Sequence, residues 1–70
     1  MASTIEYTVE GSFTPFMVLL KDDLTDTTID SALVHTAGVS QSFYNVPTGD
    51  YIIESYDTAN GVNVKPATVP

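Results

Sequence analysis

The side chains that could perform catalysis are few and scattered along the chain. His35 is the only histidine, and cysteine is absent. Nucleophilic catalysis needs a nucleophile, a base and an orienting group held together in a pocket. Ser40, Ser42 and Asp57 are residue types found in hydrolytic triads, but their spacing matches no such arrangement. We therefore expect His35 to be an ordinary surface or edge residue and the protein to be a non-enzyme without a cofactor.

A group of aspartates in one turn-forming segment raises the question of a cation site. The group consists of Asp22, Asp23, Asp26 and Asp30. Carboxylate oxygens on a loop are ligands that Ca²⁺ prefers. The spacing of an EF-hand is not met, because Leu24 occupies the third position and no glycine follows Asp26. We expect solvated turn residues here and predict no metal site.

The tyrosines have two interpretations. Tyr44 and Tyr56 alternate with the core-facing positions, so they could form an aromatic patch on one sheet face. Packing within the fold is the other interpretation. The candidate interaction residues are Tyr44, Tyr56, Asn60, Lys65 and Pro66.

The charge of the chain restricts its partners. The chain contains nine acidic residues and only two lysines, Lys21 and Lys65, which give a formal net charge of −7. Such a chain repels phosphate backbones and anionic lipids, so we expect no direct nucleic-acid or membrane partner. No apolar run approaches the roughly 20 residues that span a bilayer. The N-terminal stretch MASTIEYTVEG has neither a basic nor an apolar signal region, so we expect no secretion signal.

The length of the chain predicts one domain, residues 1–70. A domain of this size buries only about 60% of the surface that its unfolded chain exposes. Disulfides cannot add stability because cysteine is absent. We therefore expect docking onto a partner to contribute stability.

Several segments show the two-residue alternation of strands. In residues 3–10, Ile5, Tyr7 and Val9 share one face. Residues 16–22 are apolar on both faces as far as Lys21, which predicts a central strand covered on each side. Residues 29–36 have a weaker pattern, which we interpret as a third strand rather than a helical turn.

The second half of the chain contains two turn signals. Residues 39–46 and 51–57 flank Pro47-Thr48-Gly49-Asp50, which predicts an antiparallel hairpin. Asn60-Gly61 is a favoured turn pair, and residues 62–65 are the predicted last strand before Pro66. Residues 1–4 and 66–70 are predicted extended arms.

Six to seven short strands with regular turn signals predict an all-β fold, a small antiparallel β-sandwich of Ig-like or prealbumin-like type. We expect Tyr51 and Ile53 to face the core and the Tyr51 hydroxyl to reach backbone at the strand corner. The fold-defining residues are Val18, Leu20, Phe43, Val46, Pro47, Gly49, Tyr51 and Ile53.

The stretch NVPTGDY, residues 45–51, resembles the N-[VL]-P-x-G-x-Y signature of small prealbumin-like sandwiches, the Cna-B-type and carboxypeptidase-regulatory-like domains. Val18-x-Leu20-x-Asp22 is similar to the first core strand of that family. The resemblance implies a prealbumin-like sandwich. It says little about function, because one fold carries many functions.

Some members of this family form an internal Lys–Asn isopeptide. The resemblance would make Lys21 or Lys65 the lysine and Asn63 or Asn45 the asparagine. Glu54 lies three rather than four residues after Tyr51, which departs from the position of the family's catalytic acid. We therefore expect no crosslink.

Together these features predict a non-enzymatic structural protein that decorates or cements a larger assembly. We expect a tailed-phage virion, at its capsid or tail, with contacts made by edge strands and terminal arms. The expected partners are other protein subunits, including copies of this chain. The alternative is a protein- or carbohydrate-binding module that uses Tyr44, Tyr56 and the loop DTANG. That alternative predicts measurable affinity in the isolated monomer.

Overall fold

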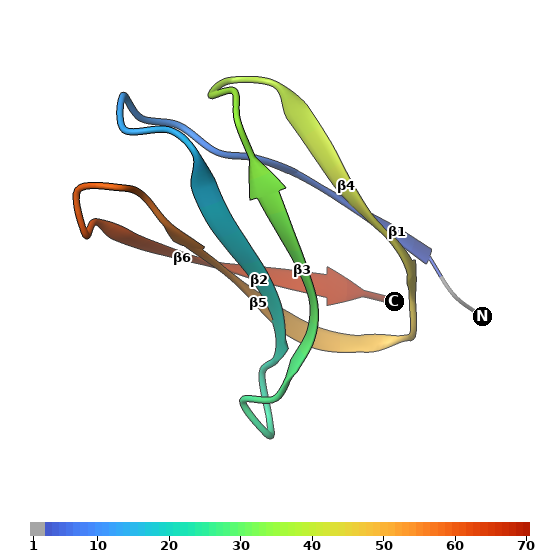
Figure 1. Cartoon of the computed structure of the whole chain (residues 1–70). Coiled ribbons are helices and arrows are strands. Elements are labelled where there is room, and N and C mark those ends of the chain that lie inside the picture. Colours follow the sequence, from blue (N-terminus) through green and yellow to red (C-terminus); the bar gives the residue numbers. More distant parts are fainter. Residues whose placement is uncertain (1–2) are drawn as a thin grey trace.

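The protein consists of two facing antiparallel sheets, as described by a computed structural model for residues 3–70. The six strands are β1 (Ser3–Thr8), β2 (Phe16–Asp22), β3 (Thr28–Val34), β4 (Ser40–Val46), β5 (Gly49–Tyr56) and β6 (Val62–Val69). β1 and β4 form a two-stranded sheet, and the other strands form a four-stranded sheet in the order β3-β2-β5-β6 (Figure 1). The predicted all-β sandwich is confirmed. Residues 3–70 include no helix able to cross a membrane.

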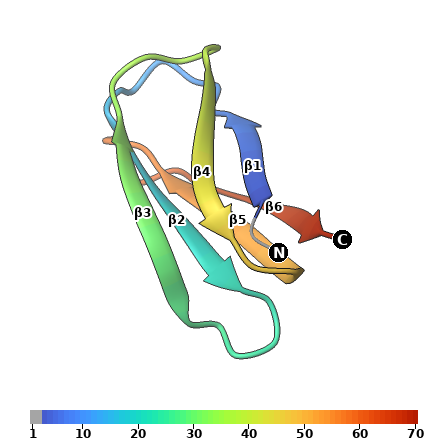
Figure 2. The ribbon, with the colours of Figure 1, turned by 90° about the vertical axis from the view of Figure 1, so that its right-hand side faces the viewer.

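The core lies between the two sheets and is built from alternate residues of the strands. Its buried residues are Ile5, Tyr7, Val9, Phe16, Val18, Leu20, Val34, Phe43, Val46, Tyr51, Ile53 and Val69. Val18 and Leu20 in the middle of β2 are fully buried. The rings of Tyr7 on β1 and Phe43 on β4 stack with centroids 4.8 Å apart. Figure 2 shows β1 and β4 side by side as the narrower layer.

The connection between β4 and β5 differs from the predicted hairpin. β4 pairs only with β1, whereas β5 pairs with β2 and β6, so residues 47 and 48 carry the chain from one sheet to the other. The hairpin prediction is therefore wrong. The Tyr51 hydroxyl donates to the carbonyl oxygen of Pro47 at 2.6 Å, which confirms the predicted contact at this corner.

A β-bulge in β4 directly precedes this change of sheet. Ser3 and Ile5 of β1 are two residues apart, but their partners Val46 and Phe43 are three apart. The extra residue lets both Phe43 and Val46 face the core, although strict alternation would turn one of them outward. Asn45 in the bulge has a φ of 58°. A bulge bends its strand, and here it bends β4 toward the corner.

The predicted C-terminal arm is also corrected. Residues 66–69 belong to β6, which pairs with β5 from Tyr56 opposite Val62 to Gly49 opposite Val69. Pro66 is tolerated because β6 is an edge strand, where one side of the backbone needs no ladder donor. Of the predicted N-terminal arm, Ser3 and Thr4 lie in β1, and residues 1–2 fall outside the described residues.

Candidate interaction surface

The outward side of the four-stranded sheet carries a row of apolar side chains across all four strands. Met17 on β2 lies opposite Leu33 on β3 and opposite Tyr56 on β5. Tyr56 lies opposite Val62 on the edge strand β6. Residues directly opposite each other in a sheet project from the same face, and the adjacent residue Phe16 is buried in the core. The Met17 row therefore points away from the core.

Two further rows follow along the strands. Leu19 lies opposite Ser31 and Glu54, and Glu54 lies opposite Val64. Lys21 lies opposite Ile52, which in turn lies opposite Pro66. We call the three rows together the outer face. Its residues are Met17, Leu19, Lys21, Ser31, Leu33, Ile52, Glu54, Tyr56, Val62, Val64 and Pro66.

The apolar part of the outer face is open to solvent. Met17, Leu33, Val62 and Val64 are 44%, 53%, 58% and 54% exposed. β2 was predicted to be covered on both sides, and that prediction is wrong because the second sheet packs against the inner side only. Soluble proteins rarely expose large contiguous apolar patches outside interaction sites.

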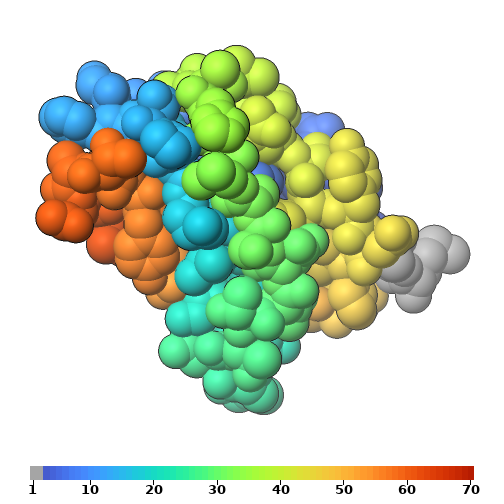
Figure 3. Space-filling model, viewed as in Figure 1, coloured from blue at the N-terminus to red at the C-terminus, as the bar shows by residue number. Residues whose placement is uncertain are grey.

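The loop between β1 and β2 contacts the turn between β5 and β6. In Figure 3 that loop (blue) adjoins the turn between β5 and β6 (orange). The amide of Thr58 in the turn donates to the carbonyl oxygen of Phe13 in the loop at 3.2 Å. Phe13 is more than half exposed. An exposed phenylalanine therefore lies in a loop whose backbone is bonded to the turn that follows Tyr56.

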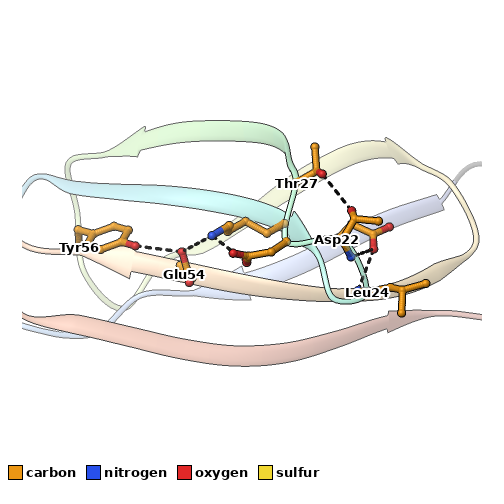
Figure 4. Close-up of polar contacts among 8 residues, drawn as sticks. Asp22, Leu24, Thr27, Glu54 and Tyr56 are labelled. Atoms are coloured by element: carbon orange, nitrogen blue, oxygen red, sulfur yellow. Dashed lines mark hydrogen bonds and ion pairs between the residues drawn. The ribbon is translucent and has the colours of Figure 1, made fainter.

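A small polar network lies among these rows. Lys21 Nζ is 2.9 Å from Asp26 Oδ1 and 3.3 Å from Glu54 Oε2. The Tyr56 hydroxyl donates to Glu54 Oε2 at 2.9 Å (Figure 4). The hydrogen bond to Asp26 is the main cause that raises the pKa of Lys21, desolvation opposes it, and Glu54 adds to it. The hydrogen bond to Glu54 is the main cause that raises the pKa of Tyr56.

These contacts favour the charged form of Lys21 and give it a structural role. An amine is nucleophilic only when it is neutral, and both carboxylates favour the charged ammonium. The ion-pair partners of Lys21 are Asp26 and Glu54, rather than the asparagines that the resemblance suggested. Lys65 lies opposite Ile53, on the inner side of its sheet.

Two of the predicted turn aspartates accept hydrogen bonds from neighbouring backbone amides. Asp22 Oδ1 accepts a hydrogen bond from the amide of Leu24 at 2.9 Å (Figure 4). It accepts a second from the amide of Thr25 at 3.1 Å. Asp30 Oδ1 accepts a bond from the amide of Ser31 at 2.8 Å. The prediction of turn residues is confirmed for Asp23 and Asp26, whereas Asp22 ends β2 and Asp30 lies in β3. Within the described chain, no three His, Asp or Glu side chains are grouped as a metal ion would require.

The predicted interaction residues do not come together as one surface. Tyr44 is 69% exposed on β4, whereas Tyr56 belongs to β5 in the other sheet, so the two do not form the proposed common patch. Asn60 lies in the β5–β6 turn with a φ of 67°. Only Tyr56 and Pro66 belong to the outer face.

The residues considered for catalysis lie on different elements of the fold. His35 is exposed after β3, as expected, and Ser40 and Ser42 lie on β4. Asp57 Oδ1 accepts hydrogen bonds from the amides of Ala59 and Gly61, which fixes it in the β5–β6 turn.

Sequence reasoning missed the outer face, although two signals were present. Met17 and Leu19 were recognised as a second apolar side of β2 but were assigned to a covered layer. Val62 and Val64 alternate with Asn63 and Lys65 on the edge strand. Their common face could be recognised only once the strand order was known.

The structure is a small all-β fold with two sheets. This agrees with the general fold that the resemblance of residues 45–51 implied. Within this motif, the hydrogen bond from Tyr51 to the Pro47 carbonyl holds the corner between the two sheets. Comparison with known proteins found no matching protein-family model, no similar curated protein and no similar solved structure.

Proposed function

We propose that this chain is a non-enzymatic structural protein that decorates or cements a larger protein assembly. The virion of a tailed phage is the assembly we expect, with the chain made in the host cytoplasm and incorporated there. The observation that supports the proposal is the exposed apolar outer face, with Met17, Leu33, Val62 and Val64 each about half exposed.

The physical reason is that the small core leaves an apolar surface in water. Only one side of the four-stranded sheet is covered by the second sheet. Burying apolar surface contributes about 25 cal/mol per Å². A neighbouring subunit seated on the outer face would therefore stabilise both the contact and this small domain, because a partner that binds only the folded state raises its stability.

The outer face replaces the terminal arms as the contact that we propose. Residues 66–69 are already paired with β5, so they are not free to lie along a neighbour. The free edges of β3 and β6 border the outer face and would lie at the rim of the interface. The alternative of a shared aromatic binding platform lacks support, because Tyr44 and Tyr56 lie on different sheets.

The test is incorporation into particles. A tagged chain is produced in cells that make the particles, and its amount in gradient-purified particles is measured by quantitative mass spectrometry. The wild type is expected at a fixed number of copies per particle. The variant Met17→Ser/Leu33→Ser is expected to fall by about tenfold or more, since two apolar contacts are lost and each 1.4 kcal/mol is worth about tenfold.

The matched control is Val39→Ser/Tyr44→Ser, which removes two exposed apolar side chains on or next to β4 in the other sheet. It is expected to be incorporated like the wild type. Circular dichroism of each purified variant verifies that it is folded. Absence of the wild-type chain from particles, or equal incorporation of all three proteins, would overturn the proposal.

A further inference from the structure

The outer face is electrically asymmetric along its strands. The rows through Met17 and Leu19 contain one charged residue, Glu54. Beyond the Lys21 row, Asp50 lies opposite Thr68 and accepts a hydrogen bond from its hydroxyl at 3.2 Å. The amide of Asp23 donates to the carbonyl oxygen of Asp50 at 3.0 Å, so the β2–β3 turn adjoins this end.

We call this end of the outer face the acidic end. It comprises Glu54 of the outer face and three carboxylates that lie beyond the Lys21 row, Asp23, Asp26 and Asp50. Lys21 is the cation among them, and its charge is already shared between Asp26 and Glu54. Lys65, the remaining basic residue of the chain, projects from the opposite side of the sheet. The acidic end therefore presents an excess of negative charge directly beside an apolar patch.

A second copy of the chain is a poor occupant for this surface. Each copy has a formal net charge of −7, so association brings two strongly acidic proteins together. A two-fold dimer uses the same patch on both copies. If the strands of the two faces run in the same direction, the acidic ends oppose each other. If they run in opposite directions, each acidic end covers the apolar patch of its partner. Both arrangements oppose binding.

We propose that the occupant of the outer face is a different protein whose surface combines an apolar patch with adjacent Lys or Arg side chains. This inference rests on the proposed function and adds the chemistry of the partner. Apolar contact would be made with Met17, Leu33 and Val62, and the basic side chains would lie over Asp23, Asp50 and Glu54. Such complementary charge speeds encounter and fixes orientation, and salt weakens it.

The test uses two defined probes that need no knowledge of the assembly. Both are synthetic amphipathic peptides with the same leucine face, one with lysine and the other with glutamate on its polar face. Binding to the full chain is followed by NMR through the methyl signals of Met17, Leu33, Val62 and Val64. The lysine peptide is expected to shift these signals with a Kd at least about tenfold below that of the glutamate peptide, and the difference is expected to disappear at high salt.

Charge variants distinguish binding at the outer face from a general attraction of the lysine peptide to an acidic protein. Asp23→Lys/Asp50→Lys alters the acidic end, and Glu6→Lys/Glu10→Lys alters exposed residues of the β1 region. Each double variant raises the formal net charge from −7 to −3, because each replacement adds two charges. The acidic-end variant is expected to weaken the lysine peptide by about tenfold or more, and the matched variant by less than about threefold.

Three results would overturn the inference: equal binding of the two peptides, equal effects of the two charge variants, or methyl shifts that depend on chain concentration without any peptide. The last result identifies a second copy as the occupant. Particle incorporation that requires Met17 and Leu33 but ignores the charge variants would refute the basic partner and leave the proposed function intact. Peptide binding without particle incorporation would refute the proposed function and leave the inference of a basic partner intact.

Discussion

The Tyr51 hydroxyl donates a 2.6 Å hydrogen bond to the Pro47 carbonyl oxygen across the corner where the chain passes from one sheet to the other. The ring of Tyr51 is buried in the core, so one side chain fixes both the packing of β5 and the path of the corner. Gly49 lies beside this contact and has a φ of 158°, a backbone conformation that residues with a side chain rarely adopt.

Tyr51→Phe is expected to lower the free energy of unfolding by about 1–2 kcal/mol, because a partly buried hydrogen bond to the Pro47 carbonyl is lost. Urea denaturation followed by circular dichroism measures this change. Tyr44→Phe is the matched control, because Tyr44 is 69% exposed, and its effect is expected to stay within about 0.5 kcal/mol. Equal effects of the two substitutions would show that the corner hydrogen bond contributes nothing.

Leu20→Ala is expected to destabilise the fold by about 2–5 kcal/mol, since Leu20 is fully buried in the middle of β2 and its truncation leaves a cavity. In a domain of this size that loss is comparable with the total stability. Leu24→Ala changes the same residue type at a position that is 93% exposed and is expected to have little effect. Thermal melts of both variants check the difference, and similar melting temperatures would contradict the proposed core.

Val62→Thr/Val64→Thr is expected to leave the unfolding free energy within about 1 kcal/mol of the wild type, because both side chains are more than half exposed. The same variant is expected to bind the neutral apolar dye Nile red less strongly, since the apolar patch is reduced. Fluorescence titration measures the dye. A large loss of stability would mean that these valines support the fold itself rather than a docking surface.

Asp26→Asn is expected to lower the pH at which Lys21 titrates, because the hydrogen bond to Asp26 is the main cause of its raised pKa. Asparagine keeps a side chain that tolerates the φ of 59° at this position. Glu54→Gln is expected to have the smaller effect. The measurement is ¹³C NMR of the Lys21 side chain as a function of pH.

The sign of the linked stability change follows from the raised pKa of Lys21. The ion pairs stabilise the fold fully while pH is below the ordinary pKa of lysine, and the contribution is lost as pH rises through the raised value. Stability should therefore fall at alkaline pH less steeply in Asp26→Asn than in the wild type. An unchanged Lys21 titration in both variants would refute these ion pairs.

The inward-facing residues could be predicted from the sequence because strand periodicity is local. Val18 and Leu20 on β2, and Tyr51 and Ile53 on β5, follow the two-residue alternation and are buried. The corner contact of Tyr51 was predictable for the same reason, since Pro47 and Tyr51 are close in the chain.

Long-range contacts decided the rest. The same turn residues suit a hairpin or a change of sheet, and the choice depended on β4 pairing with β1 and β5 with β2. Pro66 looked like the end of a strand, but the position of β6 at the sheet edge removed the need for its missing amide donor. The order of apolar residues in 16–22 showed that β2 has two apolar sides. Only the tertiary structure determined which side is covered, because burial depends on where the second sheet packs, and that left Met17 and Leu33 in solvent.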